Sequence, residues 1–223
     1  MMHDDQAQTI GVLGAGKAGS AIARLALRAG LDVLMASSRP TADLTERLLC
    51  VAPGARATST EQLLAEAELA ILAVPLRRFR ELPLALLADH VVVDLMNDWP
   101  SHDGMLPDFA GADRPSSVIV QDALPTTARL VKTLNHLGYH QIEELARPAG
   151  STDRAALAVA GDDPNAVATV ARLIDRLGFD AVRAGTLHDS ATMQPGSVIF
   201  GMHLGADSMR RALVAATGDT RAA

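Results

Sequence analysis

The sequence predicts an α/β fold: a doubly wound, mainly parallel sheet with helices on both faces and a small helical lobe at the C-terminus. Three observations support it. Apolar runs of strand length alternate with longer segments of helical period along the 223 residues. The runs Ile71–Val74 and Val91–Val93 contain no alternating polar residues, as expected for central strands buried on both faces. Hydrophobic residues make up 48% of the chain, which is enough to fill the core of a domain of this size.

The expected elements follow from these runs in order. Strands are expected at Thr9–Leu13, Asp32–Ala36, Leu69–Val74, Val91–Leu95, Ala128–Leu134 and Leu157–Ala160, with a shorter one near Ala181–Arg183. Helices are expected at Lys17–Ala29, Thr41–Leu49, Glu61–Glu66 and Leu76–Leu87, the last open to interruption at Pro83. A further helix has Asp163 as its N-cap and Pro164 at its first position, and it ends before Gly178.

The C-terminal part has a pattern of its own. From about Ser190 to Ala216 the chain reads as one helix after an irregularity at Pro195-Gly196, and this stretch is too short for a second domain. Residues 1–187 are therefore expected to form the main domain. Residues 188–223 are expected to form a helical extension, packed on that domain or on a partner subunit. The least regular segment is Asn97–Ser117.

Composition argues against several classes of function. The net charge of −6 has the wrong sign for gripping nucleic-acid phosphates, and an aromatic content of 3% leaves little to stack on bases. No apolar run approaches the roughly 18 residues of a membrane span, and the acidic start is unlike a signal peptide. With Cys50 as the single cysteine, neither an intramolecular disulfide nor a cysteine-rich zinc site can form. We therefore expect a cytoplasmic protein that binds neither nucleic acid nor membrane.

A glycine-rich turn, Gly14-Ala15-Gly16-Lys17-Ala18-Gly19, joins the first expected strand to the first helix. In a G-x-G-x-x-G turn, Gly14 would make the tight bend, Gly16 would let a pyrophosphate approach the backbone, and Gly19 would let helix and strand pack closely. The free N–H groups at the helix start would then hold the phosphates. The strand–turn–helix context favours a dinucleotide-binding, Rossmann-type domain over an ordinary structural turn.

The turn after the second strand bears on the choice of dinucleotide. An NAD site would carry Asp or Glu there to bind the ribose 2′-hydroxyl, but the chain reads Ser37-Ser38-Arg39. Two hydroxyls and a guanidinium suit a 2′-phosphate, so we expect NADP(H). The alternative is that this segment only caps the next helix and leaves Arg39 in solvent.

Further candidate contacts follow later strands. Val74, Pro75 and Leu76 end a strand where ligands bind, and they could wall the nicotinamide ribose; Pro75 could equally just start a helix. Asn97 is a polar candidate for the substrate. No metal site is expected, because the acidic residues around it lack ligand spacing and form a solvated loop more readily.

These residues together resemble the NADPH-dependent reductases of the deazaflavin coenzyme F420 and the related dinucleotide-binding reductases. Four stretches carry the resemblance: Leu13–Gly19; Ser38-Arg39; Val131–His136; and Ala158–Asp163 with Leu177–Phe179 and Ala184–Leu187. The F420 reductases usually have His where this chain has Asn135, and Pro where it has Gly138.

The resemblance implies an NADP(H)-dependent oxidoreductase that passes hydride directly to a planar partner, a deazaflavin (coenzyme F420) or a flavin. Leu134, Asn135 and His136 would lie near this second ligand, and no catalytic residue is assigned except His136 as a possible one. Related reductases are often homodimers, so a homodimer is expected. Two alternatives stay open: reduction of a small carbonyl, imine or metal complex, with Lys132 or His136 giving a proton, and a non-catalytic dinucleotide sensor.

Overall fold

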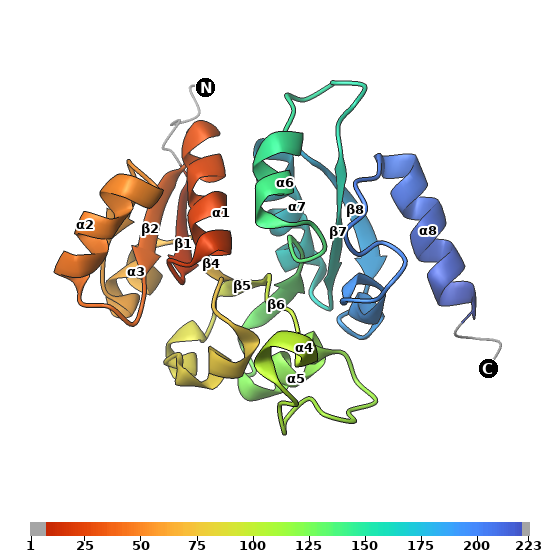
Figure 1. Cartoon of the computed structure of the whole chain (residues 1–223), viewed down its shortest axis with the longest axis horizontal. Coiled ribbons are helices and arrows are strands. Elements are labelled where there is room, and N and C mark those ends of the chain that lie inside the picture. The colour runs from red at the N-terminus through yellow and green to blue at the C-terminus, as the bar shows by residue number, and fades with distance from the viewer. Residues whose placement is uncertain (1–7, 220–223) are drawn as a thin grey trace.

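The computed structural model describes residues 8–219, which form one eight-stranded sheet in the order β3-β2-β1-β4-β5-β6-β7-β8 (Figure 1). The strands are β1 (Thr9–Leu13), β2 (Asp32–Ala36), β3 (Arg56–Ala57), β4 (Leu69–Leu72), β5 (Val91–Asp94), β6 (Arg129–Lys132), β7 (Ala156–Gly161) and β8 (Asp180–Gly185). Every neighbouring pair is parallel except β6 and β7, which run antiparallel. The first six strands have the doubly wound order 3-2-1-4-5-6, whose switch point lies between β1 and β4.

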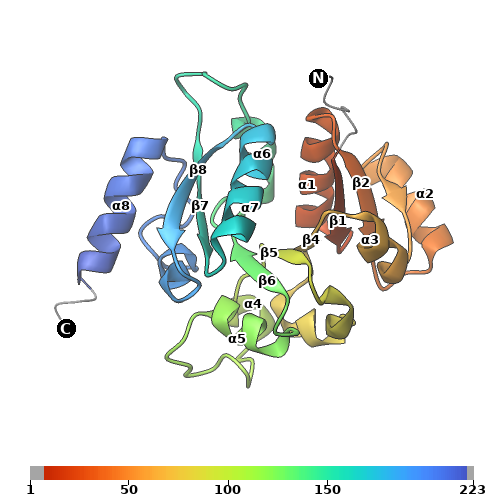
Figure 2. The ribbon, with the colours of Figure 1, turned by 180° about the vertical axis from the view of Figure 1, so that it is seen from behind.

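Helices connect the strands and flank the sheet. They are α1 (Lys17–Arg28), α2 (Thr41–Val51), α3 (Thr60–Glu66), α4 (Pro100–Asp103), α5 (Ser116–Ala123), α6 (Tyr139–Leu145), α7 (Pro164–Arg176) and α8 (Ala206–Asp219), with 3₁₀ turns η1 (Leu76–Glu81), η2 (Leu84–Leu87) and η3 (His188–Met193). In Figure 1, α2 and α8 lie at opposite ends of the molecule, and Figure 2 shows the same arrangement from behind. None of the described helices is long and apolar enough to cross a membrane.

Both faces of the sheet are covered, as the unbroken apolar runs in β4 and β5 require. One core lies under α1, α2, α6 and α7, where Ile10, Val33 and Ile71 are buried. The opposite core lies under α3, η1, η2 and α5. Because side chains alternate along a strand, the even and odd positions of β4 and β5 feed different cores. The central strands are therefore fixed from both sides, and their carboxyl ends form a rigid edge.

The sequence prediction needs four corrections. The two residues of β3 are too short to show an apolar pattern, and they were missed. The helix expected at Leu76–Leu87 is instead two 3₁₀ turns, separated at Leu82 and Pro83 because proline gives no backbone N–H. Two helices were not expected: α4 lies inside the irregular segment Asn97–Ser117, and α5 begins at the end of that segment and runs to Ala123. The single helix expected from Ser190 to Ala216 is η3, a non-helical stretch at residues 194–205, and then α8.

The C-terminal segment packs on its own chain. Met209 and Leu213 of α8 are buried together with Met193, Ile199 and Val182, so that a third core forms over β7 and β8. The expected cap of α7 is present, since the Asp163 carboxylate accepts a hydrogen bond of 2.7 Å from the Ala166 N–H. This packing brings the loop before α8 close to the end of β6, where the Gly201 N–H donates to the His136 carbonyl at 2.7 Å.

Candidate functional site

Two cavities adjoin at the carboxyl edge of the sheet. The first, of about 380 Å³, lies over the ends of β1 and β2, and the second, of about 560 Å³, lies over the ends of β5 and β6. Gly16, Ala73, Val74 and Pro75 line both of them. The two cavities therefore form one groove, which crosses the sheet at its topological switch point, where doubly wound folds bind ligands.

The glycine turn lies between the two cavities. Gly14 has a φ of +123°, and a Cβ there would lie 2.3 Å from the Ala73 carbonyl oxygen. At Gly19 a Cβ would lie 2.0 Å from the Gly14 carbonyl oxygen, whereas at Gly16 it would meet no atom within 4 Å. Gly14 and Gly19 thus serve the fold, and Gly19 lines neither cavity. Gly16 instead faces open space in front of the helix N-terminus, a cradle that fits a phosphate group.

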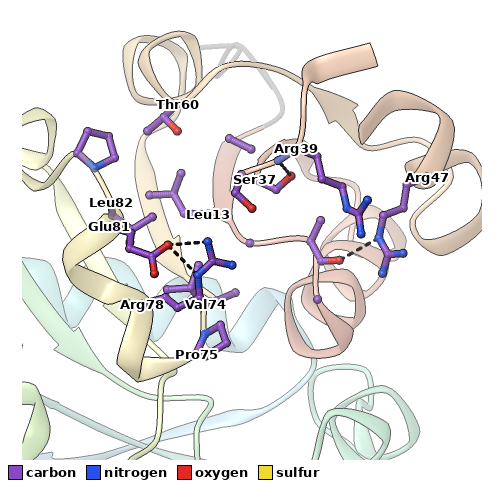
Figure 3. Close-up of a pocket in the computed structure, with 17 residues that line it drawn as sticks. Leu13, Ser37, Arg39, Arg47, Thr60, Val74, Pro75, Arg78, Glu81 and Leu82 are labelled. Carbon is purple, nitrogen blue, oxygen red and sulfur yellow. Dashed lines mark hydrogen bonds and ion pairs between the residues drawn. The ribbon is translucent and has the colours of Figure 1, made fainter. Parts of the chain in front are cut away.

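Two arginines lie side by side in the first cavity, as Figure 3 shows for Arg39 and Arg47. Arg39 follows β2, where its N–H donates to the Ser37 hydroxyl at 3.2 Å, and Ser38 lines the same cavity. The Arg47 Nε donates to the Ala15 carbonyl of the glycine turn at 3.2 Å. Within residues 8–219 neither guanidinium has an ion-pair partner. Two adjacent positive charges in a chain of net charge −6 indicate a site for an anion.

A second pair of side chains bounds the far side of this cavity (Figure 3). The Arg78 guanidinium donates to the Glu81 carboxylate at 2.8 and 2.6 Å, and this hydrogen bonding lowers the pKa of Glu81. Arg78 is thus already neutralised, in contrast to Arg39 and Arg47. Sequence reasoning missed Arg47, Arg78 and Glu81, since helical charges are normally solvated.

The second cavity is largely apolar and holds all four residues expected near the second ligand: Asn97, Leu134, Asn135 and His136. Lys17, Ala18 and Leu76, from the cofactor set, also line it. The indole of Trp99 packs edge-on against the Phe200 ring, with centroids 5.4 Å apart. Tyr139 adds a third ring, and the Lys17 ammonium lies 5.7 Å from its centroid. Trp99, Tyr139 and Phe200 were not singled out from the sequence.

The Asn97 and Asn135 side chains form a polar edge in this cavity. The Asn97 Nδ2 donates to the Asn135 carbonyl at 2.8 Å, and the Asn135 Nδ2 donates to the Asn97 Oδ1 at 3.0 Å and to the Met193 carbonyl at 2.7 Å. The preceding residue, Leu134, has a φ of +63°, which is uncommon for a residue with a side chain. These bonds hold the strained turn after β6 in place.

Lys132, considered above as a proton donor, is not on the cavity wall. Its buried ammonium contacts the Asp94 Oδ2 at 3.2 Å and also donates to the Met96 carbonyl. Asp94 in turn accepts from the Met96 N–H at 2.8 Å and from the Ser117 hydroxyl at 2.7 Å. Burial lowers the pKa of Lys132, and the Asp94 carboxylate opposes that shift. The pair fixes the backbone beneath the cavity and does not face a substrate.

His136 is fully buried, and burial lowers its pKa to about 4. The backbone of Ala156 opposes this shift only partly, and neither ring nitrogen reaches a partner in good hydrogen-bond geometry among the described residues. The imidazole is therefore neutral at pH 7. Among the described side chains of residues 8–217, which leave out that of His102, no group of three or more His, Cys, Asp or Glu residues is arranged to hold a metal ion.

Comparison with known proteins connects this groove to a family. Residues 9–98, which carry the glycine turn and the Ser-Arg segment, match the family model described as "NADP oxidoreductase coenzyme F420-dependent". The crystal structure of the hypothetical protein SMa0349 from Sinorhizobium meliloti has 30% sequence identity and a TM-score of 0.73, covering 88% of this chain and 95% of that one.

Two further relatives match more weakly or over a shorter stretch. The crystal structure of a candidate F420-dependent NADP reductase from Arthrobacter sp. FB24 has a TM-score of 0.68 and covers 94% of both chains, but at 24% identity this likeness shows the fold alone. The Escherichia coli K12 protein YjhV is 40% identical over 76 residues, or 34% of this chain. That match spans about half the length of the curated relative, 56% of it.

Proposed function

The chain belongs to the family of NADP oxidoreductases described as coenzyme F420-dependent, and we propose that it transfers hydride between NADP(H) and a planar redox partner, a deazaflavin such as coenzyme F420 or a flavin. One observation carries the proposal. The groove has an anion site with two unpaired arginines at one end, an open phosphate cradle in the middle, and an apolar cavity with aromatic walls at the other end. This order matches the order of groups in NADPH followed by a flat acceptor.

The residues present fit the cofactor. Gly14, Ala15, Gly16, Lys17 and Ala18 would hold the pyrophosphate, since Gly16 leaves the approach open and the N–H groups at the start of α1 are directed toward it. Ser37, Ser38 and Arg39 would hold the 2′-phosphate. Val74, Pro75 and Leu76 would wall the nicotinamide ribose, because the first two line both cavities and Leu76 lines the second.

The residues of the chain would align the dinucleotide with the acceptor and exclude water from between them. When bound, NADPH supplies a hydride, so that NADPH, a proton and the oxidised ring give NADP⁺ and the dihydro ring. Leu134, Asn135 and Asn97 would position the acceptor, and the apolar wall would keep water from the reacting faces. His136 is neutral and Lys132 is tied to Asp94 and Met96, so neither offers a proton to the cavity at neutral pH.

The position of Tyr139 supports a second candidate function, the reduction of a small carbonyl or imine. Reduction of a small carbonyl or imine needs a proton for the oxygen or nitrogen, and the Tyr139 side chain lines the second cavity beside the Lys17 ammonium. In this case Tyr139→Phe should lower kcat by about a hundredfold or more, because a proton donor typically contributes that much. If the acceptor is instead a ring that takes its proton from solvent, Tyr139→Phe should lower kcat far less.

The test is stopped-flow oxidation of NADPH deuterated at C4 on either face, with coenzyme F420, FMN, and a panel of cyclic imines and carbonyls. Deuterium found in the reduced deazaflavin supports direct hydride transfer. Rapid turnover of a carbonyl or imine, with no turnover of either ring acceptor, would replace the first proposal by the second. Tight NADPH binding without turnover of any acceptor would instead indicate a dinucleotide sensor.

We also propose that the protein is a homodimer and that it is located in the cytoplasm. The single cysteine needs no oxidising compartment, and Val198, Met202 and Val214 expose apolar side chains along the C-terminal segment. Analytical ultracentrifugation over a hundredfold range of concentration tests the oligomer. A sedimentation coefficient that stays at the monomer value throughout would reject it.

A further inference from the structure

We infer that the second cavity recognises its acceptor by an uncharged, flat heteroaromatic ring, and that it provides no binding site for a phosphorylated or carboxylated tail. This inference rests on the proposed function, and it narrows the class of substrate. It predicts that a ring without its charged side chain binds as well as the same ring with one.

The aromatic residues of the chain are concentrated at this cavity. The sequence has four Phe, one Trp and one Tyr, and three of these six line the cavity: Trp99, Tyr139 and Phe200. They come from three separate segments, before α4, at the start of α6, and in the loop before α8. Trp99 and Phe200 pack edge to face, with their ring planes at 77°. Such a concentration favours a planar, polarisable ligand.

The charged groups on the described lining of the cavity would all be neutralised once the dinucleotide is bound. Asp103, the one carboxylate on its described lining, accepts from the Arg77 Nε at 2.9 Å. Lys17 is the first residue of α1, next to Gly16, and its ammonium lies 5.7 Å from the Tyr139 ring centroid; under the proposed function the pyrophosphate of the bound dinucleotide would neutralise it. His136 is neutral. With NADP⁺ bound, no unpaired cation on the described lining would then be left for an anionic tail.

The cations beyond the rim are paired as well. In η1, Arg77 binds Asp103, and the Arg80 Nε contacts the Asp108 carboxylate at 2.6 Å. The first cavity gives the contrast within the same chain, because the one carboxylate on its described lining, Glu81, is bonded to Arg78, and Arg39 and Arg47 form no ion pair among the described residues. One end of the groove is thus built for a phosphate, and the other end is built for an uncharged ring.

The experiment uses Trp99, the single tryptophan of the chain, as a built-in probe. Wild-type protein saturated with NADP⁺ is titrated with riboflavin and with FMN, and Trp fluorescence quenching gives each Kd. The two ligands share one chromophore, so their inner-filter corrections are identical. We expect both to quench, with Kd values within about threefold at 20 and at 200 mM NaCl. A Kd for FMN at least tenfold lower than that for riboflavin, or no quenching by riboflavin, would overturn the inference.

Two variants sharpen the result. Phe200→Ala should weaken riboflavin and FMN equally, by about tenfold, because it removes a stacking wall. Arg77→Gln, the matched control, should leave the ratio of the two Kd values unchanged; selective loss of FMN affinity would identify Arg77 as a tail-binding residue and reject the inference. Quenching by both rings without any hydride transfer would reject the proposed function while supporting the inference. Turnover only of acceptors that carry a charged side chain would reject the inference while supporting the proposed function.

Discussion

Asn97 and Asn135 hydrogen-bond to each other across the carboxyl ends of β5 and β6, and the Met193 carbonyl fixes which way the Asn135 amide points. A carbonyl can only accept, so the Asn135 NH₂ group must face it. The remaining atom, the Asn135 Oδ1, is buried and has no partner among residues 8–219. An acceptor in that state is suited to an N–H group of a bound ring.

Replacing this amide by a carboxylate tests the arrangement. In Asn135→Asp, an oxygen would replace the donor that now faces the Met193 carbonyl and the Asn97 Oδ1, so stability at pH 7 should fall by about 2–3 kcal/mol. The new carboxyl would have a raised pKa, and its penalty should shrink as the pH falls through that pKa and the group takes up a proton. Urea unfolding at pH 7 and pH 4.5 measures both effects. Equal destabilisation at the two pH values would contradict the assigned orientation.

Arg39 should set the preference for NADPH. Arg39→Ala removes one charge-assisted contact of about 1.5–3 kcal/mol, which is a tenfold to hundredfold loss of NADPH affinity, and should leave NADH affinity unchanged. Arg47→Ala should weaken NADPH in the same direction, since its guanidinium lies beside Arg39. Arg172→Ala, on the exposed side of α7, is the matched control. Isothermal titration gives the constants, and equal wild-type affinities for NADH and NADPH would reject the 2′-phosphate site.

The three glycines of the turn should respond differently. Gly16→Val should fold with an unchanged melting temperature and fail to bind NADPH, because its side chain would occupy open space in the groove. Gly14→Ala and Gly19→Ala should lose about 2–3 kcal/mol or more, since their Cβ atoms would overlap backbone oxygens. Calorimetry and NADPH titration separate the two effects. Normal NADPH binding by Gly16→Val would show that the glycine turn has only a structural role.

His136 should make stability depend on pH. Its folded pKa of about 4 lies below the unfolded value of 6.5, so the unfolded state binds the proton more tightly. Its contribution is fully present above pH 6.5 and is lost as the pH falls toward 4, by about 3 kcal/mol. His136→Asn should lack this slope in urea unfolding between pH 7.5 and 4.5, which separates it from the carboxylate background. The variant should also change the acceptor KM more than kcat; a kcat loss near a hundredfold would indicate a proton donor instead.

Lys132 should be a structural residue. Lys132→Met leaves the buried Asp94 carboxylate without its cation, at a cost of about 3–5 kcal/mol. Adding Asp94→Asn should recover part of this loss, because the unpaired charge is removed. The midpoints of urea unfolding of the single and the double variant measure this recovery. A double variant no more stable than the single one would mean that the ion pair is not the reason for the loss.

The sequence predicted the parts of the site that depend on local chain geometry. The Gly14–Gly19 turn, the Ser-Arg segment and the strand ends are each contiguous, so spacing alone places them at one edge of a parallel sheet. The aromatic wall could not be predicted in this way, because Trp99 and Phe200 are a hundred positions apart and meet only where residues 194–205 return to the sheet. Arg47 was missed for a related reason: its contact with Ala15 depends on how α2 crosses the turn.

The strip formed by Gly16, Ala73, Val74 and Pro75 separates two cavities and belongs to both. A dinucleotide lying across it is a bivalent ligand, with its pyrophosphate as a short tether. Once the adenine end is seated, the nicotinamide end is present at an effective concentration on the order of millimolar or more, so it needs little affinity of its own. The second cavity can then exchange its acceptor rapidly, while the arginine pair at the far end holds the dinucleotide only until the hydride has passed, because NADP⁺ must leave before the next NADPH binds.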